Sequence, residues 1–297
     1  MGHFTYSDGV AVWKLVFYSP ALLISAFVAA RHGFAKSSGW IFLTIFCIVR
    51  IVGSAAELVL VSNPTSHDAS TTALICSVLG LSPLLLSSLG LLSRSFYSII
   101  KQPWNMVFSF VVLRIVQTPA AVGLILCIVG ATSANTPAQI YNEDTVKAGV
   151  ILFTVVFILL CILTGGAALG CRSTGKGEKP LMLAVAFALP FILVRIIYVL
   201  IATFGHNADF LIGNESASAV TIDLFMETLE ECAVVVIYLA TGLKLQSVPT
   251  GEDDTLGGKL MYRFGRGDFG GGKLGLLSLG AAVIGGKKNN PQKTSQV

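Results

Sequence analysis

Charged residues are scarce in this sequence. They make up 12% of the 297 residues, about half of the roughly 25% that is usual in a soluble domain. Apolar residues make up 54% and gather in blocks of about 20, the length of helix that crosses the roughly 30 Å hydrocarbon core of a bilayer. The composition therefore excludes an ordinary soluble domain and gives no support to nucleic-acid binding. It predicts a helical membrane protein whose first partner is the lipid bilayer.

Several kinds of reactive site are also missing. The four histidines lie in predicted loops or near the N-terminus, so no metal site is expected within the membrane, and no motif indicates a cofactor. The sequence contains no glycine-rich phosphate loop and no nucleophilic serine motif. The six cysteines lie in or beside apolar blocks, which argues against a disulfide framework.

The apolar blocks predict an all-α membrane protein, a seven-transmembrane-helix bundle formed by residues 1–245. Prolines within four of the spans remove backbone hydrogen bonds and are expected to kink their helices: Pro20, Pro83, Pro119 and Pro190. Residues 246–297 are rich in glycine and basic residues and are predicted to form a disordered cytoplasmic tail. The predicted spans cover about residues 9–30, 40–61, 72–93, 105–130, 146–170, 180–204 and 220–243.

Lysine and arginine divide the predicted loops into two sets. The loops after spans 1, 3 and 5 contain all the loop bases, whereas the loops after spans 2, 4 and 6 contain acids instead. Because positive charge stays on the cytoplasmic side, the N-terminus is predicted outside and the C-terminus inside. The sequon that begins at Asn214 then lies in an outer loop, so we predict a glycoprotein with its glycan at Asn214. The pattern fits the plasma membrane and the endomembranes equally.

Charged residues also occur inside the predicted spans, where lipid disfavours them. A charged residue at the bilayer centre costs about 2.5–3.5 kcal/mol on the insertion scale. In the segment DLFMETLEEC, residues 223–232, the four carboxylates fall within about 100° of the helix circumference, so this stripe is expected to face the bundle interior. Nine charged residues lie within spans 1, 2, 4, 6 and 7: Lys14, Arg50, Glu57, Arg114, Arg195, Asp223, Glu227, Glu230 and Glu231.

Counting about 1.5 Å per residue from each span centre brings opposite charges to the same depths. Arg50, Arg195 and Glu231 fall near the midplane, and Glu227 falls with Lys14 on the outer side. Intramembrane charges usually mark ligand or ion pathways, so we predict a charged pocket that binds, senses or translocates a small amphiphilic or anionic ligand. The arginines would hold its polar group and the glutamates would balance the charge. The predicted ligand-binding residues are Arg50, Glu57, Arg114, Gln117, Arg195, Glu227, Glu230 and Glu231.

Two other interpretations of the intramembrane charges stay open. In the first, they form an ion-pair network that fixes the order of the helices and leaves no cavity. In the second, Glu227 and Glu230 are desolvated acids of a membrane enzyme that acts on a lipid or an isoprenoid. A sensing role would also predict a cytoplasmic partner that binds the tail or the inner loops.

Three segments have distinctive sequences: RHGFAKSSGWIFLTIFCIVRIVGS at residues 31–54, GLSPLLLSSLGLLSR at residues 80–94, and VVIYLATGL at residues 235–243. They resemble a family of fungal seven-helix membrane proteins of unknown function. The resemblance covers residues 5–245 and excludes the tail. It implies a seven-helix fold and a fungal source, and it supplies neither an activity nor site residues.

Overall fold

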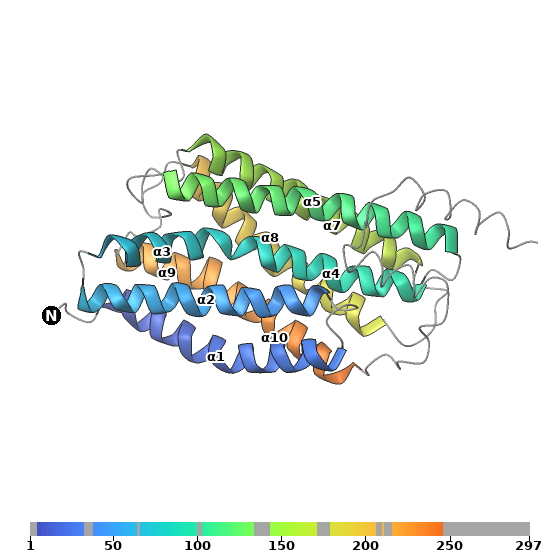
Figure 1. The fold of residues 1–297 in the computed structure, drawn as a ribbon, viewed down its shortest axis with the longest axis horizontal. Helices are drawn as coiled ribbons and strands as arrows, with labels where there is room; N and C mark the ends of the chain where they lie inside the picture. Colours follow the sequence, from blue (N-terminus) through green and yellow to red (C-terminus); the bar gives the residue numbers. More distant parts are fainter. Residues whose placement is uncertain are drawn as a thin grey trace, which may run out of the picture.

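The computed structural model describes residues 5–32, 38–63, 66–99, 103–133, 143–170, 179–205, 210 and 216–245. Within these ranges the chain is helical and contains no strand, and its long helices lie side by side in one elongated bundle (Figure 1). The elements are α1 (Tyr6–His32), α2 (Ser38–Ser62), α3 (His67–Leu79), α4 (Leu81–Ile99), α5 (Pro103–Ser133), α7 (Asp144–Gly170), α8 (Lys179–Phe204), α9 (Ala217–Asp223), the π-helical turn η3 (Leu224–Thr228) and α10 (Leu229–Lys244).

Six apolar helical segments are long enough to cross a bilayer, which indicates an integral membrane protein. They correspond to the first six predicted spans, and α3 and α4 together form the third. The seventh predicted span, residues 220–243, is not among them. That segment is helical, as α9, η3 and α10, but its four carboxylates lower its apolar character. The all-helical membrane class is thus confirmed, whereas the seventh span and the orientation stay predictions, and the predicted tail lies outside the described residues.

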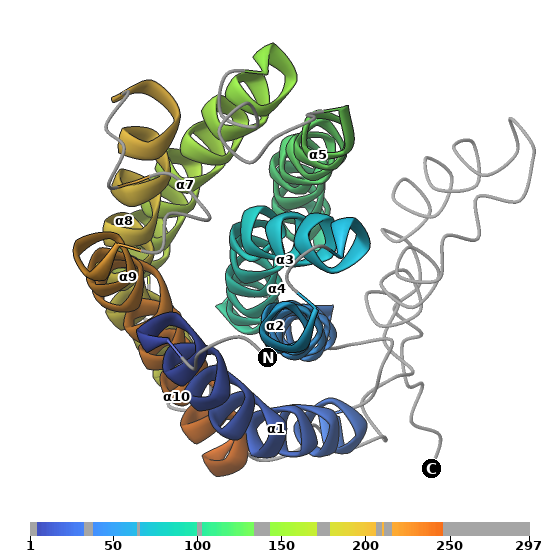
Figure 2. The ribbon, with the colours of Figure 1, turned by 90° about the vertical axis from the view of Figure 1, so that its left-hand side faces the viewer.

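The span formed by α3 and α4 lies at the centre of the bundle. Of its most apolar stretch, 72% is buried, against 33–39% in the other five spans. Figure 2 shows α3 and α4 between α2 and α5, with α7, α8, α10 and α1 in an arc around one side. Through α4 this central span packs against α2, α5, α7 and α8, so the residues that it presents reach most of the bundle interior.

The central span has a local irregularity at Gly80, between α3 and α4, which we call the break, although Gly80 itself keeps helical dihedral angles (φ −56°, ψ −38°). Pro83 has no backbone N–H, and a proline ring clashes with the carbonyl of the residue four positions earlier, here Leu79. The regular hydrogen bonding of α3 therefore ends at Leu79 and that of α4 begins at Leu81, two residues before the proline that is expected to kink the span. In the turn, the amide of Gly80 donates to the carbonyl of Ser77 at 3.4 Å.

Glycines bring α5 and α7 into close contact. A Cβ at Gly149 would lie 2.9 Å from the carbonyl oxygen of Gly123 and 2.5 Å from Cys127 Sγ, and one at Gly130 would lie 2.4 Å from Val146 Cγ2. Close backbone approach at small residues is a common way for helices to associate in lipid. This pair of helices forms the wall of the bundle that faces α4.

The outer surface is apolar, and charges lie inside. Leu23, Ile115 and Phe187 are among the exposed side chains, at 73%, 63% and 64% exposure. In contrast, five charged residues are buried: Lys14, Arg50, Arg195, Glu227 and Glu231. This is the distribution expected of a helical bundle that lipid surrounds, and it directs attention to the buried charges.

Candidate functional site

Two arginines and two glutamates meet inside the bundle. Arg50 Nη2 lies 2.8 Å from Glu227 Oε1 and also donates to Glu231 Oε1. Arg195 contacts the same two oxygens, with Nη2 at 2.9 Å from Glu227 and Nε at 3.1 Å from Glu231. None of the four is more than 5% exposed, and two positive charges balance two negative ones, as buried charges require. We call this group the four-residue network: Arg50 on α2, Arg195 on α8, Glu227 in η3 and Glu231 on α10.

Aromatic rings from the same helices cover both guanidinium groups. Arg50 Cζ lies 5.6 Å from the ring centroid of Phe46, and Arg195 Cζ lies 5.3 Å from that of Tyr198. Each ring is about one helical turn from its arginine, where side chains on a helix are neighbours. Cation–π attraction in such a desolvated place is worth on the order of 2 kcal/mol, so each helix holds its own arginine toward the glutamates.

A π-helical turn presents Glu227. In η3 the amide of Leu229 donates to the carbonyl of Leu224, five residues earlier. Such turns insert one residue into an α-helix and are frequent at functional sites. The wider turn changes the direction of Asp223 on α9 relative to Glu227 and Glu231, and Asp223 joins a different group of charges.

The break in the central span supports the network from one side. The carbonyl of Ser77 accepts a hydrogen bond from Arg195 Nη2 at 3.4 Å, and the Ser77 hydroxyl donates to Glu227 Oε1 at 3.3 Å. Next to it, the guanidinium of Arg50 lies directly against the Cα of Gly80. The turn before Pro83 therefore contacts three of the four members of the network.

A second group of charges, which we call the Lys14 triad, lies beside the network. Lys14 Nζ on α1 is 3.4 Å from Asp223 Oδ2 and 3.7 Å from Glu57 Oε1 on α2. Tyr198 donates to Asp223 Oδ1 at 3.5 Å. The side chains of Glu57 and Asp223 are 31% and 27% exposed, against 9% for Lys14, so the triad is the more accessible part of the charged interior. With one base and two acids, it has a net charge of −1.

Between the network and Tyr238 on α10, the interior is formed by neutral side chains. Tyr238 and Ser88 share a hydrogen bond of 2.6 Å, and Cys232 donates to Tyr18 at 3.5 Å. Around them lies the main hydrophobic core, in which α4 is buried continuously from Leu81 to Leu92. The described charges are therefore closed off at this end and approachable from the end that contains the Lys14 triad.

The four-residue network is not saturated with hydrogen bonds. Arg50 Nε, Arg195 Nη1 and Glu227 Oε2 are buried, and none of them has a hydrogen-bond partner among the described residues. A buried polar atom without a partner costs about 1–3 kcal/mol, and such atoms in native proteins usually bind water, an ion or a ligand. Two guanidinium N–H donors and one carboxylate oxygen of the network are thus available to bind another group.

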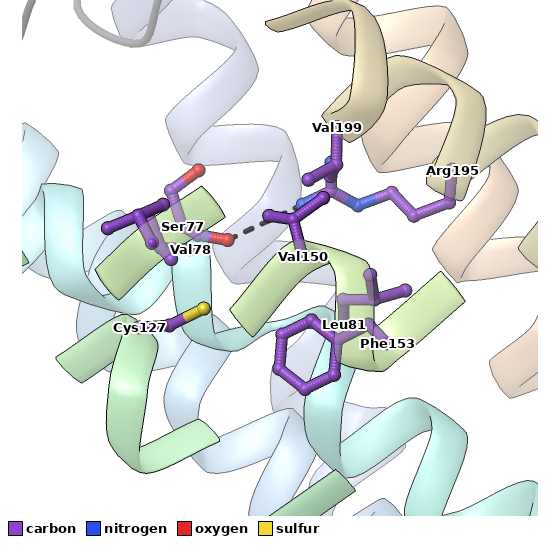
Figure 3. Close-up of a pocket in the computed structure, with 9 residues that line it drawn as sticks. Ser77, Val78, Leu81, Cys127, Val150, Phe153, Arg195 and Val199 are labelled. Carbon is purple, nitrogen blue, oxygen red and sulfur yellow. Dashed lines mark hydrogen bonds between the residues drawn. The ribbon is translucent and has the colours of Figure 1, made fainter. Parts of the chain in front are cut away.

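Two small cavities adjoin the network, and each has room for about one water molecule. Arg195 forms one wall of the first, which we call the apolar cavity (Figure 3). Its lining residues are Ser77, Val78, Leu81, Cys127, Val146, Val150, Phe153, Arg195 and Val199. The second, the polar cavity, is lined by Lys14, Val49, Arg50, Gly53, Ser54, Glu57, Ala73, Cys76 and Ser77.

The structure brings together only part of the predicted ligand-binding set. Four of its members form the network, and Glu57 belongs to the Lys14 triad. Glu227 lies with the arginines and not, as its predicted depth indicates, with Lys14. Glu230 has no cation within ion-pair distance among the described residues, and Gln117 on α5 is half-buried and lines neither cavity. The side chain of Arg114 and the sequon residue Asn214 lie outside the described parts of the chain.

Four other residues belong to the site and are absent from the predicted set: Lys14, Ser77, Gly80 and Asp223. Lys14 and Asp223 are recognisable in the sequence as charged residues within predicted spans. Only their ion pair in the structure shows that they belong to the site. The sequence Gly-Leu-Ser-Pro at residues 80–83 is a signal for a helix break, but nothing local to it indicates that a distant arginine packs there.

A family model described as a domain of unknown function, DUF7702, matches residues 4–248, which include every helix of the described structure. No curated protein and no solved structure matches the chain.

Proposed function

The chain belongs to the DUF7702 family, and we propose that it is a seven-span membrane protein that binds, senses or translocates a small amphiphilic or anionic ligand. The observation that supports this proposal is the state of Arg195. It is buried and paired with two glutamates, yet its Nη1 has no partner among the described residues. A guanidinium with a free N–H inside an apolar bundle is suited to a carboxylate or phosphate group.

The arginines of the network can exchange partners without leaving an unpaired charge. Because each arginine contacts both glutamates, an arriving anion can take a position on Arg195 while Glu227 and Glu231 keep Arg50. The anion alone would add a negative charge to a neutral network, which is costly in an apolar interior. We therefore expect a proton or a small cation to enter with it.

The described arrangement is the closed state in this proposal. The cavities hold about one water molecule each, so a larger ligand requires helices to separate. Access is from the end of the Lys14 triad, where Glu57 and Asp223 are partly exposed.

The helical segment Ala217–Lys244 is the proposed seventh span. At about 1.5 Å per residue it is long enough to cross the hydrocarbon core, and Glu227 and Glu231 find their counter-charges inside the bundle. With this span, the loop bases favour an outer N-terminus, an outer Asn214 and a cytoplasmic tail at residues 246–297. A sensor of this topology would use the tail or the inner loops to bind a cytoplasmic partner.

Native mass spectrometry in mild detergent tests the binding function. We expect a small molecule to accompany the wild-type protein and to be lost in Arg195→Gln. The control Lys147→Gln removes a charge from a solvent-facing pair with Asp144 at the start of α7 and should retain the molecule. If neither the wild type nor Lys147→Gln retains a small molecule, the binding proposal fails and the network is only structural.

The enzyme interpretation has no comparable support. Glu227 is engaged by two arginines, and neither Glu227 nor Glu230 lines either cavity. Neither of the two cavities described here therefore places a substrate between the two carboxyl groups.

A further inference from the structure

We infer that the ligand binds in the apolar cavity lined by residues of α3, α4, α5, α7 and α8, and that it is an amphiphile with one carboxylate head and an unbranched apolar chain. This inference rests on the proposed function and specifies its ligand and its place. The argument uses the donors at the cavity wall, the chemistry of its lining and the packing beside it.

The donors at the wall suit one anionic head. Arg195 is 2% exposed and lines the cavity, and its Nη1 has no partner among the described residues, while its Nη2 is bound to the Ser77 carbonyl (Figure 3). The free thiol of Cys127 enters the same cavity from α5. One charged N–H without a partner is suited to a single carboxylate head, and the thiol adds a weak donor to the same cavity.

The remaining lining excludes more polar ligands. Val78, Leu81, Val150, Phe153 and Val199 present only hydrocarbon to the cavity, and Arg195 is its only charged lining residue among the described residues. A sugar or a multiply charged anion would leave polar groups without partners there. The polar cavity is a poorer place for an amphiphile, because its charged lining residues Lys14, Arg50 and Glu57 are already paired with other residues and it presents little hydrocarbon to an apolar chain.

The packing beside the apolar cavity leaves scope for it to enlarge. Four of its lining residues belong to a small second hydrophobic cluster, in which only four side chains are fully buried and six are partly buried. The partly buried ones are Leu74, Ile75, Val78, Val199, Leu200 and Phe210. This cluster extends from the cavity along α8 toward Phe204, so a chain that starts at Arg195 can lie along it.

The break at Gly80 permits the movement that opens the cavity. Residues of α3 are mostly half-buried, whereas α4 is wholly buried from Leu81 to Leu92. Because Pro83 cannot donate a backbone hydrogen bond to Leu79, the span is weakest between them, and α3 can tilt away from α7 and α8 while α4 stays packed. The carbonyl and hydroxyl of Ser77 would move with α3, which releases Arg195 and Glu227 when a head group arrives.

The test measures binding of tritiated decanoate to the full chain in phosphatidylcholine nanodiscs. From Arg195 to Phe204 the helix rises about 13 Å, close to the length of a ten-carbon chain. We expect saturable binding of decanoate, and binding at least about tenfold weaker for decanol and for inorganic phosphate. Val150→Trp fills the cavity and should weaken decanoate binding at least about tenfold. The control Ile151→Trp adds the same bulk to the next residue, which is 51% exposed on the outer face, and should stay within about twofold of wild type.

Val199→Phe fills the same cavity from α8 and tests the location of the ligand if Val150→Trp does not fold. Folded cavity-filled variants that bind decanoate like wild type would overturn the location, and tighter binding of decyl phosphate than of decanoate would overturn the carboxylate head. Absence of saturable decanoate binding would overturn the ligand class. Each of these results leaves the proposed function intact if mass spectrometry still finds a molecule that depends on Arg195.

Discussion

The guanidinium of Arg50 lies so close to Gly80 that no other residue fits there: a Cβ at position 80 would be 2.2 Å from Arg50 Nη2. The far end of this arginine has little freedom to yield, because its Nη2 is bound to two glutamates. The break in the central span and the position of the network therefore depend on each other.

Gly80→Ala should destabilise the protein. Overpacking of a tight interior typically costs about 1–3 kcal/mol, and here it would also displace a buried charge. The control is Gly165→Ala on α7, where an added Cβ meets nothing within 4 Å and should be neutral or raise stability by up to about 1 kcal/mol through helix propensity. Thermal unfolding of both variants in nanodiscs makes the comparison, and equal effects would contradict the tight contact.

Removing one charge from the network should be worse than removing a balanced pair. Glu231→Gln leaves two guanidinium groups to share one carboxylate and should cost about 3–5 kcal/mol of unfolding free energy. Arg195→Met/Glu231→Met keeps the pair of Arg50 and Glu227 at 2.8 Å and should cost less than either single change. Steric trapping in bicelles measures these free energies, and strictly additive values would show that the four residues are not coupled.

The Lys14 triad should contribute less to stability than the network. Glu57 is 31% exposed, and Lys14 keeps Asp223 when Glu57 is changed, so Glu57→Gln should cost at most about 1 kcal/mol. Lys14→Met leaves two acids facing each other without a base and should cost more. The same unfolding measurement ranks the two variants, and the reverse order would argue against the pairing described here.

Hydrogen–deuterium exchange should distinguish the two halves of the central span. We expect amides of α3 to exchange faster than those of α4, because α3 is half-buried and is separated from α4 by the break. Pro83→Ala removes the cause of the break and should bring the two rates closer together. Equal rates in the wild-type protein would show that α3 does not move independently.

The predicted orientation is open to a direct test. Protein from a glycosylating host should lose mass on glycosidase treatment, and Asn214→Gln should abolish that loss. An epitope tag after the last residue should react with antibody only after the cells are permeabilised. Reaction of the tag in intact cells would reverse the orientation.

Six of the seven predicted spans correspond to apolar helices of the structure, because lipid imposes a simple rule on length and polarity. The six apolar segments begin and end within a few residues of the predicted spans, apart from the third, where α3 begins at His67 and the predicted span at residue 72, and the fourth, whose apolar part begins at Ile115 in the described structure. The prolines did not single out the irregular span: four spans were expected to kink, and Pro20, Pro119 and Pro190 lie inside the continuous helices α1, α5 and α8. The positions of the apolar helices depend on neighbours in sequence, and so they can be predicted from the sequence.

The details of the site were harder to predict, because they depend on contacts between distant segments. A regular helix places Glu230 on the same stripe as Glu227 and Glu231, but the structure includes a π-helical turn, and Glu230 has no ion-pair partner among the described residues. Depth counted from span centres assigned Glu227 to Lys14, because the counting ignores helix tilt and the long reach of arginine. The contacts of Ser77 could not be predicted, because they depend on where the guanidinium of Arg195 lies in the folded structure.

The network also sets an order of events during synthesis. Arg50 is separated from Glu227 by 177 residues and from Glu231 by 181. As chains are made from the N-terminus, α2 and α8 enter the membrane before any of the acids that neutralise their arginines exist. A nascent chain that stops before Glu227 thus contains two arginines without the carboxylates that neutralise them, and the arrival of the last helix completes the network.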